Sequence, residues 1–483
     1  MTLNPAQLHE HERVVAAAQT APGRLLIWAL ASALLIGSDF ALPSIAAVTL
    51  VMLFPHRRRL ILSVCTLALI VGYALEDQGL DPDAPLVWLT SADLSHWLRA
   101  FILSAALVAL LYGFVSVARR FQQLPTVVRK RPLLVFHALI LLGLQLIGAV
   151  PWLAALSGYL ELIPYLAWRI GYLLMLARRG KATGTQGKDH LFYLWPVWGG
   201  EDLPIGKGLD YLARHEAGDR QAFARSQLAG IKLLILAVLW TWVLQLMDAA
   251  VHGLNDNPFA AWLGGWTLGI PRLQDTLRGH GVSGIALAWL SLYLELIHVT
   301  LETAIWGHVI VGCLRLLGFN VFRNTYKPLL AESIIEYWGR FSHYFKELCV
   351  DFFFYPAFMR CAWAGPRLRL FIAIFAAAFV GNMYFHILEE PELLIEGDPT
   401  ALWARWGSRM VYCLLLAVGV WVSMLRQQSQ RATVVKTAVS SLTRIRRIGG
   451  VWTYYAVIHI WHIELNDVGP GERARFLAAA LGL

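Results

Sequence analysis

Long apolar runs dominate this chain and restrict the folds it can adopt. A transmembrane helix needs roughly 20 consecutive apolar residues. Ten runs reach or approach this length, at 24–54, 60–75, 97–118, 132–154, 156–177, 229–250, 284–318, 368–388, 403–425 and 449–463. Two of them are long enough to hold two passes each. Because a backbone in lipid must satisfy its own hydrogen bonds, helices are the expected structure. The sequence predicts an all-α polytopic membrane protein with about ten to twelve spans.

Composition and charge support a bilayer environment. Hydrophobic residues make up 57% of the chain and charged residues 15%, against roughly 25% charged in soluble domains. The formal net charge is +9, but the basic residues lie in short loops between apolar runs, as in Arg57 to Arg59 and Arg129 to Arg131. Such loops are typical of the cytoplasmic side, and the acidic connection from Glu76 to Asp93 is expected on the other side. The positive charge therefore indicates a membrane surface and not nucleic acid.

The order of polar and apolar segments suggests a linear domain organisation. We predict a cytoplasmic amphipathic or disordered lead at 1–23, scaffold helices at 24–177 and a cytoplasmic polar or re-entrant connection at 178–228. A core is predicted at 229–400, followed by a C-terminal set of helices with a tail at 401–483.

One polar stretch, 317–356, lies between strongly apolar segments. It carries Arg340, His343, Lys346 and Asp351, and unpaired charge in hydrocarbon costs several kcal/mol. The stretch is therefore expected to line a cavity or an interface.

Two other groups of titratable residues are candidates for chemistry. His298 lies between Glu295 and Glu302 on one predicted helical face, and could be a structural cluster or a proton relay. His459 and His462 lie one turn apart with Glu464 following, a pattern that a metal site could use. The five cysteines have no CxxC spacing and predict neither a disulfide framework nor a zinc site. We expect no resident metal and no tightly bound cofactor.

The polar stretch resembles the membrane-bound O-acyltransferase (MBOAT) family. Members carry an apolar helix ending in Leu-Leu-Gly-Phe, an Asn-Phe-x-x-Pro-Tyr segment, Ser-x-x-x-Phe-Trp-x-Arg-Trp-His and an Asp-Tyr-x-Tyr-x-Pro ending. The matching residues here are Leu316, Leu317, Gly318, Phe319, Asn324, Pro328, Ser333, Tyr337, Trp338, Arg340, Asp351, Phe352, Phe354 and Pro356. A weaker similarity upstream involves Phe192, Pro196, Gly199, Gly200, Pro204, Ile205, Gly230 and Lys232.

The sequence departs from the family pattern at two places. Ser342 occupies the position of the family's His or Asn, and His343 follows it. One residue turns a helical side chain by about 100°, so Ser342 and His343 can share a narrow tunnel only if the helix is broken there. The family's other histidine corresponds best to His386, although the Ile-Trp-His at His462 is a rival. The interval from Arg340 favours His386.

The resemblance implies a helical bundle around a central tunnel and assigns roles to residues of this chain. His386, His343 and Ser342 become catalytic candidates, with His386 as general base. Either Ser342 or His343 would fill the second site position. The substrate-binding candidates are Trp338, Arg340, Asn324, Asn382 and Tyr337. Arg340 has a second interpretation as a helix ion pair with Glu336, four residues earlier.

The implied activity is transfer of an acyl group from a cytoplasmic thioester, acyl-CoA or an acyl carrier protein with its phosphopantetheine arm, to a hydroxyl. The acceptor would be an envelope polysaccharide, a lipid or a secondary metabolite, with an extracytoplasmic partner finishing the transfer in some systems. The implied location is the bacterial cytoplasmic (inner) membrane. Two alternatives stay open. One is a proton-coupled transporter or flippase, a class in which an inverted internal repeat is typical, and no such repeat is found in this sequence. The other is a non-catalytic scaffold.

Overall fold

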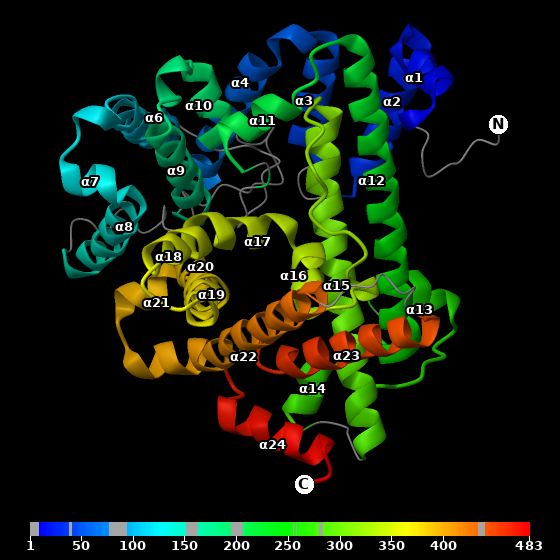
Figure 1. Cartoon of the computed structure of the whole chain (residues 1–483). Helices are drawn as coiled ribbons and strands as arrows, with labels where there is room; N and C mark the ends of the chain where they lie inside the picture. The colour runs from blue at the N-terminus through cyan, green and yellow to red at the C-terminus, as the bar shows by residue number, and fades with distance from the viewer. Residues whose placement is uncertain are drawn as a thin grey trace. The chain divides into compact units, whose positions relative to one another are not determined.

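The structure is a computed structural model that describes residues 9–37, 41–76, 94–150, 163–194, 205, 207–254, 256, 258–279, 284–432 and 440–483. Over these residues the chain is helical, with one isolated antiparallel bridge between Glu216 and Phe319 (Figure 1). The prediction of an all-α polytopic membrane protein is confirmed.

Six helices in the described ranges are long and apolar enough to cross a membrane, or up to seven if a bent pair, Glu12–Gln19 with Ala21–Leu35, forms one span. The six are Leu94–Arg119, Pro132–Ala149, Arg220–His252, Ile285–Leu316, Pro366–Glu389 and Pro399–Ser429. The larger number expected from the sequence included apolar runs that fold here as shorter helices, such as Ala41–Leu53. It also included runs that extend into residues outside the described ranges. The acidic connection is one segment that lies mostly outside them, together with Pro196, Gly199, Gly200 and Pro204.

Contacts divide the chain into two compact units that differ from the linear domains expected from the sequence. Unit 1 comprises Met1–Ile235 and Val309–Phe322, and unit 2 comprises Leu236–His308 and Arg323–Leu483. The predicted core and the C-terminal helices thus fold largely together, because α22 (Pro399–Ala432) packs against helices from both segments.

Unit 1 is a helical bundle in which α4 (Arg58–Glu76) packs against α3 (Ala41–Leu53), α6 (Leu94–Arg119) and α10 (Gly187–Leu194). Its other α-helices are α1 (Glu12–Gln19), α2 (Ala21–Leu35), α7 (Thr126–Lys130), α8 (Pro132–Ala149), α9 (Ile163–Arg178), α11 (Leu209–His215) and the first part of α12 (Arg220–Met247). The unit is completed by the end of α15 (Ile285–Leu316) and the residues that follow it.

The end of α15 shows why the Leu-Leu-Gly-Phe sequence stops a helix. Gly318 has a φ of +90°, and the Phe319 N–H donates to the Leu314 carbonyl at 2.9 Å, as in a Schellman motif. A Cβ at Gly318 would meet Arg58 Nη1 at 2.5 Å and the Phe223 ring at 2.7 Å. Only glycine satisfies both the backbone angle and this close packing.

Unit 2 contains the polar stretch from Arg323 onward, with helices from both earlier and later in the chain. Its short elements are α13 (Pro258–Trp262), α14 (Leu273–Leu277), α16 (Ile334–Phe341), α17 (His343–Cys349), α18 (Tyr355–Arg360), α19 (Pro366–Phe375), α20 (Asn382–Glu389) and α21 (Pro391–Glu396). Among the described residues of unit 2, π-helical turns follow α12 at η6 (Asp248–His252), join α17 to α18 at η8 (Val350–Phe354) and join α19 to α20 at η9 (Ala376–Gly381).

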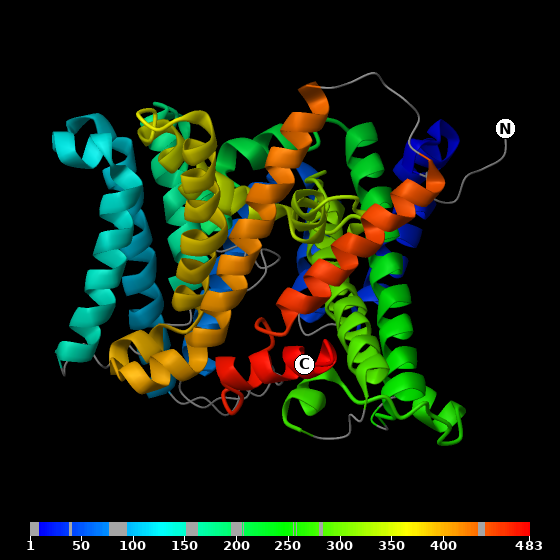
Figure 2. The same ribbon diagram turned by 60° about the horizontal axis from the view of Figure 1, so that its bottom comes forward.

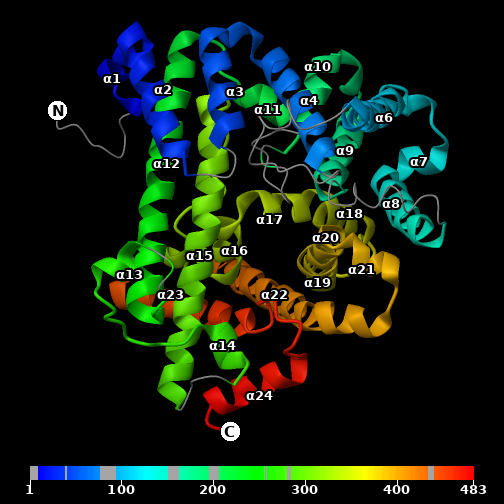
Figure 3. The same cartoon turned by 180° about the vertical axis from the view of Figure 1, so that it is seen from behind.

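The last helices of unit 2 bring its C-terminal residues back to the polar stretch. α23 (Ser441–His459) packs against both α16 and α22, and α24 (Pro470–Ala480) packs against α14 and α22. In Figure 2, α22 and α23 converge toward the end at which α24 lies. Figure 3 shows α17 to α20 grouped together, as their mutual contacts require.

Candidate functional site

The polar stretch is broken at Ser342. α16 ends before this residue and α17 begins after it, while Ser342 has extended backbone angles, φ −136° and ψ 92°. Asn324 stabilises the break, because its Oδ1 accepts from the Tyr344 N–H at 3.2 Å and from the Ser342 hydroxyl at 3.5 Å. The Asn324 carbonyl accepts from the His343 N–H at 2.9 Å. Because the helix is broken here, the side chains of Ser342 and His343 are not held at the angle between adjacent helical residues. Both could therefore serve one site.

The rest of α16 is fixed by a cap, an ion pair and an aromatic stack. The Ser333 hydroxyl caps the helix by accepting from the Glu336 N–H. The ion pair predicted from the spacing is present, with Arg340 Nη2 2.6 Å from Glu336 Oε1. Tyr337 is buried and stacks on Tyr455 of α23 with ring centroids 3.8 Å apart. Trp338 is also buried in α16.

α17 and α20 touch through an aromatic pair. Phe345, two residues after His343, packs edge-to-face on Phe385 with ring centroids 4.9 Å apart. Further along, a Cβ at Gly381 would lie 2.6 Å from Cδ2 of Phe353, so a glycine permits this close approach. The half-buried His343 therefore lies in a helix that contacts α20 at Phe385, the residue before His386.

His386 is buried near the end of α20 and contacts two charged side chains. It is 9% exposed, and its Nδ1 lies 2.5 Å from Oε2 of Glu389 on the next turn of the same helix. Arg409 of α22 reaches the same ring nitrogen through Nη1 and also contacts Glu464. These contacts fix the orientation of the imidazole from two different helices. Asn382 is buried one turn before His386 on the same helical face.

His386 and His462, the two candidates for the family's other histidine, lie close together. The ring of His462 faces that of His386 at 6.2 Å between centroids, and Tyr412 packs on His462 at 4.6 Å. His459 stacks on His462 at 5.0 Å. We call His386, His459, His462, Arg409 and Tyr412 the histidine cluster. His459 Nε2 is buried and has no hydrogen-bond partner in the described part of the chain.

α23 joins the histidine cluster to the polar stretch. Tyr455 packs on Tyr337 of α16, and one helical turn later His459 stacks on His462. The Tyr455 hydroxyl also donates to the Ile334 carbonyl at 2.8 Å. Residues far apart in the sequence are thereby assembled in one part of unit 2.

Ion pairs enclose the outer edge of the histidine cluster. Arg405 donates from Nε to both carboxylate oxygens of Glu390 at 2.8 Å and from Nη2 to Glu464 at 2.9 Å. Burial disfavours the charged form of Glu390, but the ion pair and hydrogen bonds with Arg405 outweigh it and lower the pKa of this carboxyl.

A second titratable cluster lies on α15 of unit 2. Arg272 makes a bidentate contact with Glu295, 3.1 Å at each oxygen, and its Nη1 lies 2.9 Å from His298. His298 Nε2 is 3.2 Å from Asp248 Oδ1, and its Nδ1 is 3.4 Å from Glu302 Oε1. Each carboxylate of the cluster thus has a basic partner, as expected of a structural cluster.

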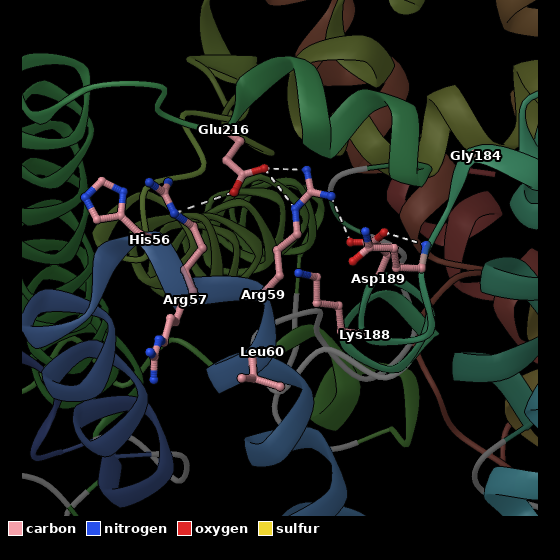
Figure 4. Close-up of a pocket in the computed structure, with 10 residues that line it drawn as sticks. His56, Arg57, Arg59, Leu60, Gly184, Lys188, Asp189 and Glu216 are labelled. Atoms are coloured by element: carbon pink, nitrogen blue, oxygen red, sulfur yellow. Dashed lines mark hydrogen bonds and ion pairs between the residues drawn. The ribbon is translucent and has the colours of Figure 1, made fainter.

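Unit 1 contains an open pocket of about 510 Å³ with a strongly basic lining. We call it the basic pocket; it is lined by His56, Arg57, Arg58, Arg59, Leu60, Gly184, Gln186, Lys188, Asp189 and Glu216. Figure 4 shows Arg59 between the two carboxylates and Lys188 extending toward Arg59. Arg59 Nη1 lies 2.8 Å from Asp189, and its Nε lies 3.0 Å from Glu216. These carboxylates raise the pKa of Arg59 although burial opposes the shift.

Several members of these clusters were missed from the sequence. Arg409 had a signal, since it is a charged residue within a predicted span. Arg272 and Asp248 had none, because their role depends on how separate segments pack. Among the described residues, no group of three or more His, Cys, Asp or Glu side chains is arranged to hold a metal ion.

Comparison with known proteins adds no assignment. No family model matches the sequence, and a search of curated proteins finds no match.

Proposed function

We propose that this protein is an integral-membrane O-acyltransferase in which His386 is the general base. The observation that carries the proposal is the meeting of His386 and His462 beside the polar stretch that resembles the acyltransferase motif. An imidazole that is buried, oriented by a carboxylate and close to a second imidazole is suited to proton transfer.

The contacts of His386 define its chemical role. Nδ1 lies near both the Glu389 carboxylate, which accepts a hydrogen bond from it, and the Arg409 guanidinium, which can only donate one, so a given tautomer uses one of the two contacts. In the tautomer that the mechanism needs, Nδ1 donates its proton to Glu389, Arg409 lies beside the ring as a positive charge, and the Nε2 lone pair is free to accept a proton. The acceptor hydroxyl gives its proton to Nε2 while its oxygen attacks the thioester carbonyl carbon. When the tetrahedral intermediate collapses, the carbon–sulfur bond breaks and the imidazolium returns the proton to the thiolate.

The oxyanion of that intermediate needs a hydrogen-bond donor. Asn382 is the first candidate, because it is buried on the same face of α20 as His386. Its amide has no hydrogen-bond partner within the ranges that the structure describes. Ser342 and His343 remain alternatives. Tyr337 and Trp338 would line the substrate path, whereas Arg340 and Asn324 act as structural residues through the contacts described above.

The charge distribution along α22 supports an orientation in the membrane. Acidic residues Glu390, Glu392, Glu396 and Asp398 precede the helix, and basic residues such as Arg444 and Arg447 follow it. By the positive-inside rule the histidine cluster lies nearer the extracytoplasmic side. We propose that an acyl-CoA or acyl carrier protein donates from the cytoplasm to an extracytoplasmic hydroxyl or an acyl-transfer partner, in a bacterial cytoplasmic membrane.

A transfer assay tests the proposal. Full-length protein in proteoliposomes is given radiolabelled acetyl-CoA or acyl carrier protein, with an envelope polysaccharide fraction or lipid as acceptor. Replacing a general base typically lowers the rate 10²- to 10⁴-fold, and we expect a loss on this scale for His386→Ala. His343→Ala and Ser342→Ala show which of the two contributes at the second position.

His96→Ala, a half-buried histidine of α6, is the matched control and should keep full activity. Full transfer by folded His386→Ala together with loss in His462→Ala would move the base to His462. The absence of thioester-dependent transfer across all donors would favour the transporter or scaffold interpretation.

Proton-coupled transport is a second candidate, favoured by one observation. α15 and α23, which carry His298 and His459, are in contact, since the Tyr293 hydroxyl lies 2.8 Å from Thr453 Oγ1, so the two titratable clusters of unit 2 are on neighbouring helices. Proton uptake into liposomes that is abolished by His298→Ala, with no acyl transfer in the wild type, would support this function.

A further inference from the structure

The basic pocket of unit 1 has an excess of positive charge. Its lining contributes four cations, Arg57, Arg58, Arg59 and Lys188, against two carboxylates, Asp189 and Glu216, which leaves a formal charge of +2 before His56 is counted. An open pocket with this balance attracts anions.

Two of the four cations are already engaged within the protein. Arg59 bridges Asp189 and Glu216, as described above, and Arg58 donates from Nη2 to the Ala217 carbonyl at 2.9 Å. Arg58 Nε also lies 3.5 Å from Glu216. Arg58 and Arg59 thereby neutralise the carboxylates of Asp189 and Glu216 and hold them in place.

The other two cations are exposed. In the part of the chain that the structure describes, the side chains of Arg57 and Lys188 have neither an ion-pair nor a hydrogen-bond partner. Arg57 comes from the turn before α4 and Lys188 from α10. Figure 4 shows Lys188 extending toward Arg59 and Arg57 extending away from that pair, and both exposed, flexible side chains can turn toward the oxygens of one phosphate group.

The surface beside the pocket is apolar. Leu53 and Phe54, just before the basic run, are 65% and 54% exposed, and Leu60, which lines the pocket, is 50% exposed. Such side chains next to a predicted span are expected to contact lipid. A ligand with a phosphate head and acyl chains could contact both surfaces, with its phosphate in the basic pocket and its acyl chains on the exposed apolar side chains.

We propose that the basic pocket binds a phosphate group, with the headgroup of an anionic phospholipid as its source. Arg57 and Lys188 contact the phosphate oxygens, Arg58 and Arg59 contribute the positive field, and the exposed leucine and phenylalanine side chains contact the acyl chains. This site is independent of the proposed acyl transfer, which concerns unit 2.

The test uses the full-length protein and two phosphate sources. In the lipid arm, a short-chain phosphatidic acid is titrated into protein in phosphatidylcholine nanodiscs and bound lipid is counted by native mass spectrometry. In the soluble arm, inorganic pyrophosphate is titrated into protein in neutral detergent by calorimetry. The test variant is Arg57→Gln/Lys188→Gln, and the matched control is Arg129→Gln/Lys130→Gln, two exposed basic residues of α7.

We expect saturable phosphatidic acid binding in the wild type and the control, and a dissociation constant at least about tenfold higher in the test variant. Equal melting temperatures would show that the test variant is folded, as expected for exposed positions. Binding of pyrophosphate alone, weakened by the same variant, would support the phosphate site but assign it to a soluble ligand. No saturable binding in either arm, or equal weakening in test and control variants, would overturn the proposal.

Discussion

His386 and His462 face each other across the inside of unit 2, with ring centroids 6.2 Å apart. One histidine comes from α20 and the other follows α23 near the C-terminus. The sequence presents them as rivals for one role, whereas the structure places them in one cluster with Arg409 and Tyr412.

Arg409 is expected to position the proposed base. It contacts His386 and Glu464, and it is buried in α22. Arg409→Gln should lower the kcat of acyl transfer and leave the KM of the thioester nearly unchanged, because the imidazole loses its orientation while the binding surface persists. The measurement is steady-state kinetics in proteoliposomes. Arg360→Gln, at an exposed position, should leave both constants unchanged; a rise in KM alone for Arg409→Gln would contradict the positioning role.

Asn324 is expected to stabilise unit 2 through the helix break. Its Oδ1 is the acceptor for the Tyr344 N–H, and Tyr344 is buried. Asn324→Ala leaves that donor unsatisfied and should lower the free energy of unfolding by about 1–3 kcal/mol. Thermal unfolding in detergent measures the effect. Asn320→Ala, at an exposed position, provides the comparison, and equal melting temperatures for the two variants would show that the break does not depend on this amide.

Gly381 permits the approach of α20 to Phe353. A methyl group there would lie 2.6 Å from the phenylalanine ring, so Gly381→Ala should destabilise the protein by about 1–3 kcal/mol. Adding Phe353→Leu should recover part of the loss, which a double-mutant cycle detects. Gly450→Ala in α23 meets no atom within 4 Å and should be tolerated. If the changes in the free energy of unfolding of the two single variants simply add in the double variant, the destabilisation by Gly381→Ala is not caused by a clash with Phe353.

His190 is expected to make the stability of unit 1 depend on pH. Burial and the nearby Arg119 lower its pKa to about 4, partly offset by Asp189, and Thr185 Oγ1 lies 2.6 Å from Nε2. An unfolded histidine titrates near 6.5. Between these values the unfolded state binds more protons, so stability is full above about pH 6.5 and falls as the pH decreases toward 4.

His190→Gln tests this dependence. The variant should lose less stability than the wild type between pH 7.5 and 4.5, by up to a few kcal/mol, as measured by thermal unfolding in detergent. His56→Gln, an exposed histidine of the same unit, should follow the wild type. A pH dependence that is unchanged by His190→Gln would assign the effect to other groups.

The sequence by itself determined the features that depend on local geometry and on solvent. Long apolar runs specified a helical membrane protein, since lipid leaves few alternatives for the backbone. The Arg340–Glu336 pair followed from its spacing, because residues four apart on a helix are neighbours. The local sequence also showed that either Ser342 or His343 could fill the second site position. It showed in addition that both side chains can reach one site only if the helix is broken between them.

Only the tertiary structure decided which distant residues meet. The break at Ser342 depends on Asn324, which precedes α16 in the polar stretch, and the contact between His386 and His462 depends on how α20, α22 and α23 pack. The role of Arg409 and the two-unit division of the chain also depend on contacts between helices that are distant in sequence. Helical periodicity fixes which side chains share a face, but it does not specify which other helix that face contacts.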